Sequence, residues 1–260
     1  MIPYFQATVI HLGPIPLQVW GLMVAAGIFA GLWLFSRRVT AHGGQGERVW
    51  ELAVPILVSA FIGARLAHVF LYEASFYLAQ PLEIIKIWHG GMSSLGGFMG
   101  AAVGVWYALW RHQLTWKAFV AEYLDDGILS FWLGWGIGRI GCFLIHDHPG
   151  TLTHFVGGVR YPDGVRHDLG LYESLLGFAL FGLCLALYPR LNARKKGLLA
   201  TVSLALYALV RIYFDTLRTV DTRYAGFTPA QWGMLAMILS LTGWHFFGKR
   251  LQTFGKKTND

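Results

Sequence analysis

Residues 127–145 read GILSFWLGWGIGRIGCFLI, a stretch in which Arg139 is the only charged side chain. About 20 consecutive apolar residues are needed for a helix to cross the hydrocarbon core of a bilayer. Six further stretches are comparable, and they cover approximately Pro16–Ser36, Trp50–Tyr72, Ser93–Trp110, Gly170–Tyr188, Gly197–Asp215 and Pro229–Phe247. The sequence therefore predicts an all-α polytopic membrane protein with about seven transmembrane helices, in which residues 1–260 form a single domain.

The composition excludes several classes of protein. Hydrophobic residues make up 55% of the chain and charged residues only 13%, whereas soluble domains carry about 25% charged residues. A soluble globular domain, a disordered chain and a nucleic-acid-binding module built on a basic surface are therefore excluded, and we expect no nucleic-acid partner. The two cysteines, Cys142 and Cys184, lie in apolar runs and are too few for a disulfide framework.

The distribution of basic residues predicts how the chain is oriented in the membrane. One set of loops and termini holds 13 Lys and Arg residues, the opposite set holds 5, and three arginines lie within the predicted spans. Cytoplasmic loops collect positive charge. We therefore expect the N-terminus on the outer side and the C-terminus in the cytoplasm, and the net charge of +7 requires no acidic partner.

With this orientation, the polar residues of the spans gather at one depth, in the outer leaflet. They are Arg65, His68, Arg139, Tyr172, Glu173, Tyr207, Arg211 and Asp215. Tyr207, Arg211 and Asp215 are spaced i, i+4, i+8 and share one helix face. An internal Arg–Asp pair would explain that helix alone, but three arginines exceed the acidic side chains at this depth. The surplus predicts an anionic ligand, and in a leaflet the obvious one is a phospholipid phosphate, which arginine can bind bidentately.

Two motifs allow more than one interpretation. The glycines of His89–Gly100 could bind an anion through backbone N–H groups, but their spacing alone favours close helix packing. His89 is a plausible base, although a lone histidine is more often structural. The run His146-Asp147-His148 could bind a metal, but it specifies no ligand geometry, and we favour a polar lid over the site.

A series of short motifs resembles the prolipoprotein diacylglyceryl transferase family over nearly the whole chain. The motifs are PLQVWGLMVAAG at 16–27, IGARLAHVF at 62–70, HGGMSSLGG at 89–97, GRIGCF followed by HDHPG within 138–150, RHDLGLYE at 166–173, YALVRIYFD at 207–215 and FTPAQW at 227–232. Each motif is weakly specific alone. Their order and spacing across seven predicted helices are strongly specific.

The resemblance implies a reaction and assigns roles to residues. The family transfers the diacylglyceryl group of phosphatidylglycerol to the lipobox cysteine thiol in the signal peptide of a prolipoprotein, forming a thioether and releasing glycerol phosphate, with no cofactor or metal expected. The residues expected to be catalytic are His89, Arg139, Tyr207, Arg211 and Asp215, with the two arginines on the phosphate and Tyr207 and Asp215 orienting Arg211. The residues expected to bind substrate are Arg65, Gly90, Gly91, Ser93, Cys142, Gly150, His167, Tyr172 and Glu173.

The chain also departs from the family pattern at several positions. Leu95 stands where the second histidine of the His-Gly-Gly motif is expected, and Cys142 stands in place of an asparagine. These changes leave open a paralogue that uses the same lipid donor with a different acceptor, or a phospholipid-binding or translocating protein without covalent chemistry. The resemblance implies a multi-pass protein of the bacterial inner membrane, with its active site towards the outer leaflet.

Overall fold

The computed structural model describes residues 1–13, 15–87, 90–219 and 223–254. Its α-helices are α1 (Val19–Ala41), α2 (Gly46–Leu71), α3 (Ala74–Ala79), α4 (Ser94–Arg111), α5 (Trp116–Phe119), α6 (Asp125–Ile145), α7 (Leu169–Arg194), α8 (Leu198–Thr216) and α9 (Pro229–Phe254). A 3-10 helix covers Pro81–Ile85, and a π-helical turn, Val120–Leu124, joins α5 to α6. Each of the seven apolar stretches forms most of one long helix, so the helical prediction is confirmed.

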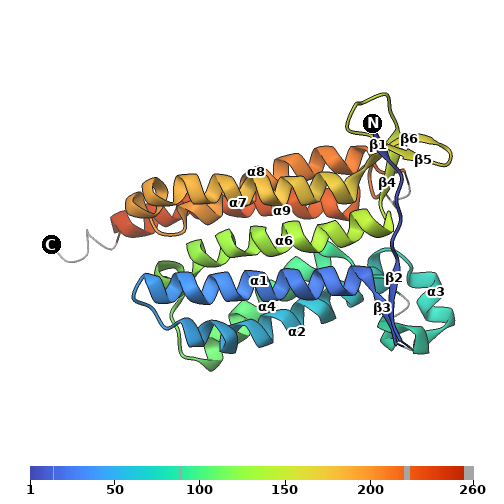
Figure 1. The fold of residues 1–260 in the computed structure, drawn as a ribbon. Helices are drawn as coiled ribbons and strands as arrows, with labels where there is room; N and C mark the ends of the chain where they lie inside the picture. The colour runs from blue at the N-terminus through green and yellow to red at the C-terminus, as the bar shows by residue number, and fades with distance from the viewer. Residues whose placement is uncertain (14, 88–89, 220–222, 255–260) are drawn as a thin grey trace.

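The long helices form one bundle with both β-sheets at the same end (Figure 1). α1 packs on α6, α2 on α4, α6 on α7, and α8 on α9. The N-terminus lies at the end that carries the sheets, and α9 runs towards the opposite end. We refer to the first as the sheet end. α2, α6 and α8 finish at the sheet end and α7 begins there, so these helices bring residues distant in sequence to one level.

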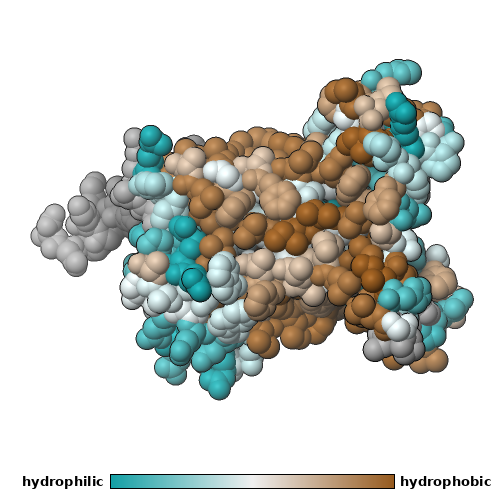
Figure 2. Space-filling view, viewed as in Figure 1, coloured by the Kyte–Doolittle hydropathy of each residue, from teal (hydrophilic) through white to brown (hydrophobic). Residues whose placement is uncertain are grey.

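Within the part of the chain that the structure describes, five helices are long and apolar enough to cross a membrane. They are Val19–Ala41, Gly46–Leu71, Trp116–Ile145, Leu169–Leu191 and Leu198–Thr216. Figure 2 shows apolar residues covering the middle of one face of the bundle, with hydrophilic residues gathered towards both ends. Large apolar side chains are exposed on the helices, among them Phe29, Trp106 and Leu239. The chain is therefore a polytopic membrane protein.

The prediction of an all-α fold is wrong in one respect, because six short strands build two sheets. The strands are β1 (Ile2–Pro3), β2 (Val9–Leu12), β3 (Ile15–Gln18), β4 (Pro149–Leu152), β5 (Val159–Tyr161) and β6 (Gly164–Asp168). One sheet has the order β1-β5-β6-β4, and β2 pairs with β3 in the other. β5 and β6 form a hairpin in which Tyr161 pairs with Gly164, and Gly164 has φ +134. This geometry suits the Pro-Asp-Gly sequence of the turn.

Glycines allow the helices of the bundle to approach closely. A Cβ on Gly100 of α4 would overlap the carbonyl oxygen of Ser59 in α2. A Cβ on Gly134 of α6 would lie 2.6 Å from the carbonyl oxygen of Gly27 in α1. Such contacts allow packing between helix backbones in a membrane. The packing interpretation of the glycine-rich segment is confirmed for Gly96 and Gly100.

Candidate functional site

The centre of the candidate site is a carboxylate held between two arginines from neighbouring helices. Glu173, in the second turn of α7, is fully buried. Its Oε2 lies 3.0 Å from Nε of Arg139 in α6, and its Oε1 accepts a hydrogen bond from Nη1 of Arg211 in α8. Nη2 of Arg211 lies 3.0 Å from Oδ1 of Asp215. We call Arg139, Glu173, Arg211 and Asp215 the charged cluster.

The sequence near each helix end holds the charged cluster in place. Asp168 caps α7, because its Oδ1 accepts a hydrogen bond from the Leu171 N–H at 2.9 Å. Asp215 is held from the other side by the hydroxyl of Thr228, which donates to Oδ2 at 2.5 Å. Thr228 and Gln231 bond reciprocally at the start of α9 as a capping box. The charged cluster is therefore fixed at the start of α7, the end of α8 and the start of α9. Thr228 supports it from outside, and the sequence interpretation did not include Thr228 among the site residues.

The two arginines differ in how open they are. Both terminal nitrogens of Arg211 are used by carboxylates, and only 3% of its side chain is exposed. Arg139 contacts Glu173 through Nε, and 11% of its side chain is exposed. Its guanidinium lies over the ring of Trp135, 4.6 Å from the centroid. Arg139 is thus the more exposed arginine of the two, and Arg211 contacts the same carboxylate from the other side.

Unpartnered polar groups lie beside the charged cluster. The Tyr207 hydroxyl and the indole nitrogens of Trp132 and Trp135 are buried with no hydrogen-bond partner among the described residues. The Tyr207 ring centroid lies 5.1 Å from that of Trp132 and 5.7 Å from that of Trp135. Among the described residues Tyr207 makes no hydrogen bond to Arg211, whereas Asp215 pairs with it. The orienting role expected of Tyr207 stays a prediction. Donors beside an arginine suit a ligand with several oxygen atoms.

Comparison with known proteins identifies the family. The family model described as "Prolipoprotein diacylglyceryl transferase" matches residues 7–247. The chain belongs to this family. It is 32% identical over 237 residues to the phosphatidylglycerol–prolipoprotein diacylglyceryl transferase of Tolumonas auensis, an alignment covering 89% of this chain and 91% of that protein. It is 32% identical over 249 residues to the transferase of the same name from Solidesulfovibrio magneticus, covering 92% of this chain and 91% of that one.

Arg65 lies at the centre of a second group, in which its partners are backbone carbonyls and not carboxylates as in the charged cluster. Nε of Arg65 donates to the carbonyl of Ile84 at 2.8 Å, and Nη1 donates to the carbonyls of Gly90 and Gly91. Further bonds reach the carbonyls of Glu83 and Lys86. Arg65 therefore folds the loop that precedes α4. In the charged cluster, by contrast, Arg139 and Arg211 pair with the carboxylates of Glu173 and Asp215.

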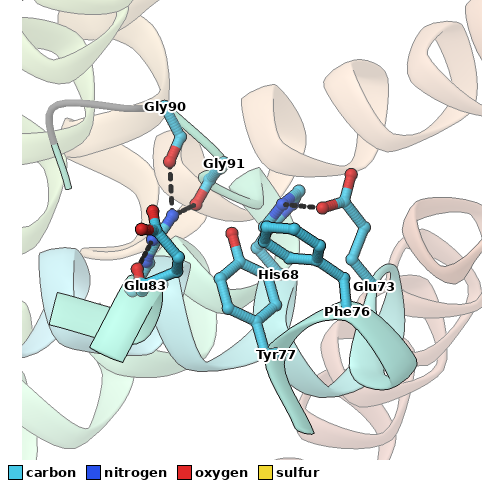
Figure 3. A pocket seen from close by; sticks show the side chains of 8 residues that line it. His68, Glu73, Phe76, Tyr77, Glu83, Gly90 and Gly91 are labelled. Carbon is cyan, nitrogen blue, oxygen red and sulfur yellow. Dashed lines mark hydrogen bonds and ion pairs between the residues drawn. The ribbon is translucent and has the colours of Figure 1, made fainter. Parts of the chain in front are cut away.

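A cavity of about 290 Å³ opens beside Arg65. Figure 3 shows His68 and Glu73 facing each other across it, with His68 Nε2 3.7 Å from Glu73 Oε2. Gly91 has φ +79, and a Cβ there would lie 2.6 Å from the imidazole of His68. The glycine at position 91 is therefore required by both conformation and space.

The remaining candidate residues have mainly structural contacts, and His89 lies outside the described residues. Ser93 caps α4 through its hydroxyl and is buried. The carbonyl of Gly150 in β4 accepts a hydrogen bond from Arg166 at 2.9 Å. Nδ1 of His167 lies 2.9 Å from the Tyr172 hydroxyl, and that hydroxyl donates to the carbonyl of Gly157 at 3.4 Å.

The His146-Asp147-His148 run divides into two parts. His146, with φ 52, ends α6 in the left-handed conformation. Its Nδ1 lies 2.6 Å from Asp168 Oδ2 and its Nε2 lies 2.8 Å from the carbonyl of Phe5. Asp147 and His148 instead lie beside Cys142, which is itself 3.7 Å from Nη1 of Arg139.

The environment of this loop perturbs both titratable side chains. Burial raises the pKa of Asp147 to about 6, against the opposing effect of Arg139. Burial and the positive charge of Arg218 lower the pKa of His148 well below its usual value. His148 is therefore a neutral imidazole at neutral pH, which distinguishes it from a polar lid that is simply hydrated.

Proposed function

We propose that this chain transfers the diacylglyceryl group of phosphatidylglycerol to the lipobox cysteine thiol of prolipoproteins. The observation that carries the proposal is the charged cluster, which holds Arg139 and Arg211 in fixed positions at one end of a membrane-spanning bundle. The membership of this chain in the transferase family indicates the reaction. Both relatives described above carry phosphatidylglycerol and prolipoprotein in their names. Phosphatidylglycerol and prolipoprotein signal peptides are thus its proposed substrates.

The geometry supports a specific division of labour. Arg139 binds the phosphate of the donor lipid, and the unpartnered hydroxyl of Tyr207 donates to the lipid oxygens nearby. Arg211 and Asp215 act as positioning residues, because their contacts end on Glu173 and on each other. Charge-assisted hydrogen bonds of this type are about twice as strong as neutral ones. A fixed guanidinium therefore stabilises the phosphate charge as it leaves, without reorganisation.

The covalent step exchanges one bond for another. The acceptor thiolate attacks the glycerol carbon that carries the phosphate ester, so an S–C bond forms and the C–O bond breaks. The electron pair of the C–O bond leaves on glycerol phosphate, next to Arg139. A free thiol has a pKa of about 8.5 and must lose its proton before it attacks.

We further propose seven spans, an outer N-terminus, a cytoplasmic C-terminus and a site that opens to the outer leaflet of the bacterial inner membrane. The charge distribution between the two loop sets supports this orientation. The charged cluster lies towards the sheet end, together with the N-terminus. A fluorescent protein fused to the C-terminus is expected to fold and fluoresce, and alkaline phosphatase fused there is expected to be inactive. The opposite pair of results would reverse the proposed topology.

The proposed reaction is tested with purified protein, labelled phosphatidylglycerol and a lipobox peptide. Mass spectrometry is expected to show a peptide heavier by one diacylglyceryl group. A peptide with serine in place of the cysteine is the matched control and is expected to stay unmodified. Release of glycerol phosphate without peptide modification would indicate a different acceptor, and bound lipid with neither product would indicate a binding or translocating protein.

A further inference from the structure

Three donor side chains converge where α6 ends, and the division of labour proposed above uses none of them. The sulfur of Cys142, a carboxylate oxygen of Asp147 and a ring nitrogen of His148 all lie within 4.8 Å of one another. Cys142 comes from the last turn of α6 and is buried. The side chains of His148 and Asp147 are 26% and 32% exposed, so the group is open on one side.

We propose that Cys142, Asp147 and His148 bind a zinc-like divalent cation whose open fourth position takes the thiol of the acceptor cysteine. This inference rests on the transferase reaction proposed above. Sulfur, imidazole and carboxylate are the zinc ligands of proteins, and catalytic sites keep three protein ligands and one open position. Zinc–ligand distances of about 2.0–2.3 Å place tetrahedral ligand atoms roughly 3.3–3.6 Å apart. Donor atoms 4.8 Å apart would thus have to close by roughly 1.2–1.5 Å.

The hydrogen bond made by His148 prepares it to act as a ligand. Its Nδ1 lies 2.8 Å from the carbonyl oxygen of Asp147. A carbonyl only accepts, so Nδ1 carries the proton and Nε2 keeps its lone pair. Metal-binding histidines are usually held in this way by a second hydrogen bond to a carbonyl or carboxylate.

The arginines near this group are compatible with a cation because the ligands of the cation neutralise it. The positive charges of Arg139, Arg211 and Arg218 all lower the pKa of His148. Nη1 of Arg139 lies 3.7 Å from the Cys142 sulfur. A divalent ion bound by one thiolate and one carboxylate is neutral overall, so it adds no net charge next to Arg139. When the acceptor thiolate also binds, the site carries one negative charge, which the guanidinium stabilises.

The cation would deprotonate the acceptor thiol without help from a histidine at position 95. Leu95 replaces the second histidine of the family's His-Gly-Gly motif, and its Cδ1 lies against the backbone of Gly233. No base can act from that side chain. A thiol that coordinates zinc is deprotonated outright. The thiol proton goes to solvent, the bound sulfur attacks the glycerol carbon, and glycerol phosphate leaves with the electron pair of the broken C–O bond.

The test measures metal binding separately from catalysis. Protein purified without chelator is expected to contain about one zinc per chain by mass spectrometry of the element. Replacement of zinc by Co²⁺ is expected to give a sulfur-to-cobalt charge-transfer band and the visible bands of tetrahedral cobalt. Both signals should disappear in Cys142→Ala and weaken strongly in His148→Ala. Cys184→Ala removes the other buried cysteine, in α7, and should keep both signals.

The acceptor is tested in the same spectrum. A lipobox peptide is expected to shift the cobalt bands, whereas its serine counterpart is not. Zinc-free protein, or cobalt bands that persist in Cys142→Ala, would overturn the metal site. Full transferase activity after complete metal removal would also overturn it while leaving the proposed function intact. Tetrahedral cobalt bands in a protein without transferase activity would support the metal site and refute the proposed function.

Discussion

Replacement of Glu173 by glutamine tests the charged cluster most sharply. The glutamate forms an ion pair with Arg139 through Oε2 and accepts a hydrogen bond from Arg211 with Oε1, and it is fully buried. Glutamine has nearly the same shape but only one acceptor oxygen, and its NH₂ group would face an arginine N–H. One of the two guanidinium contacts is therefore necessarily lost.

The expected losses of stability and of rate in Glu173→Gln follow from the burial of this carboxylate. Breaking a buried ion pair by removing one partner costs about 3–5 kcal/mol of stability. Loss of one preorganised donor in an active site costs about 10²–10³ in rate. We expect kcat/KM for the lipobox peptide to fall at least ~100-fold in Glu173→Gln, and the midpoint of thermal unfolding in detergent to fall as well.

The neighbouring residue provides the control. The Ser174 hydroxyl donates to the carbonyl of Gly136 at 2.9 Å and is also buried. Ser174→Ala should cost about 1 kcal/mol of stability and keep kcat/KM within a few-fold of the original protein. Wild-type kcat/KM together with a wild-type unfolding midpoint in Glu173→Gln would refute the assignment of Glu173 as the residue that orients both arginines.

Two further predictions concern stability, read as the midpoint of thermal unfolding followed by tryptophan fluorescence. Gly100→Ala should lower the midpoint, because the new methyl group overlaps a carbonyl of α2. Gly97→Ala should be tolerated, because the nearest atom to its new methyl group is 3.8 Å away. Equal effects of the two changes would argue against close packing between α2 and α4. Asp168→Ala should cost about 3–5 kcal/mol, because it removes the cap of α7 and a buried partner of His146. Asp163→Ala, in an exposed ion pair with Arg166, should leave the midpoint unchanged, and a comparable loss there would contradict the role given to burial.

The helices and the polar layer could be predicted from sequence for separate physical reasons. Long apolar runs locate the spans. The direction of each span then places its charged residues, and the contacts of Glu173 with Arg139 and Arg211 confirm that these three lie at one level. Which residue faces which could not be predicted, because helix rotation is set by packing. Glu173 therefore had no distinct sequence signal as the centre of the charged cluster.

Other features lacked a sequence signal altogether. Strands of two to five residues are too short for an alternation pattern to reveal them. The bonds of Arg65 end on backbone carbonyls, which any sequence can supply. The left-handed residue His146 reverses the chain, so its neighbours turn back towards Cys142 while it contacts Asp168. The spacing within the run His146-Asp147-His148 could not show that His146 lies apart from the other two residues.

The central claim is that Arg139, held by Glu173, carries the phosphate of the donor during transfer. Its most direct test measures glycerol phosphate release and peptide modification in the same reaction, for the original protein and for Arg139→Ala. We predict equal amounts of the two products from the original protein and loss of both in Arg139→Ala, with protein that remains folded. Unchanged rates of both products in Arg139→Ala would contradict the claim.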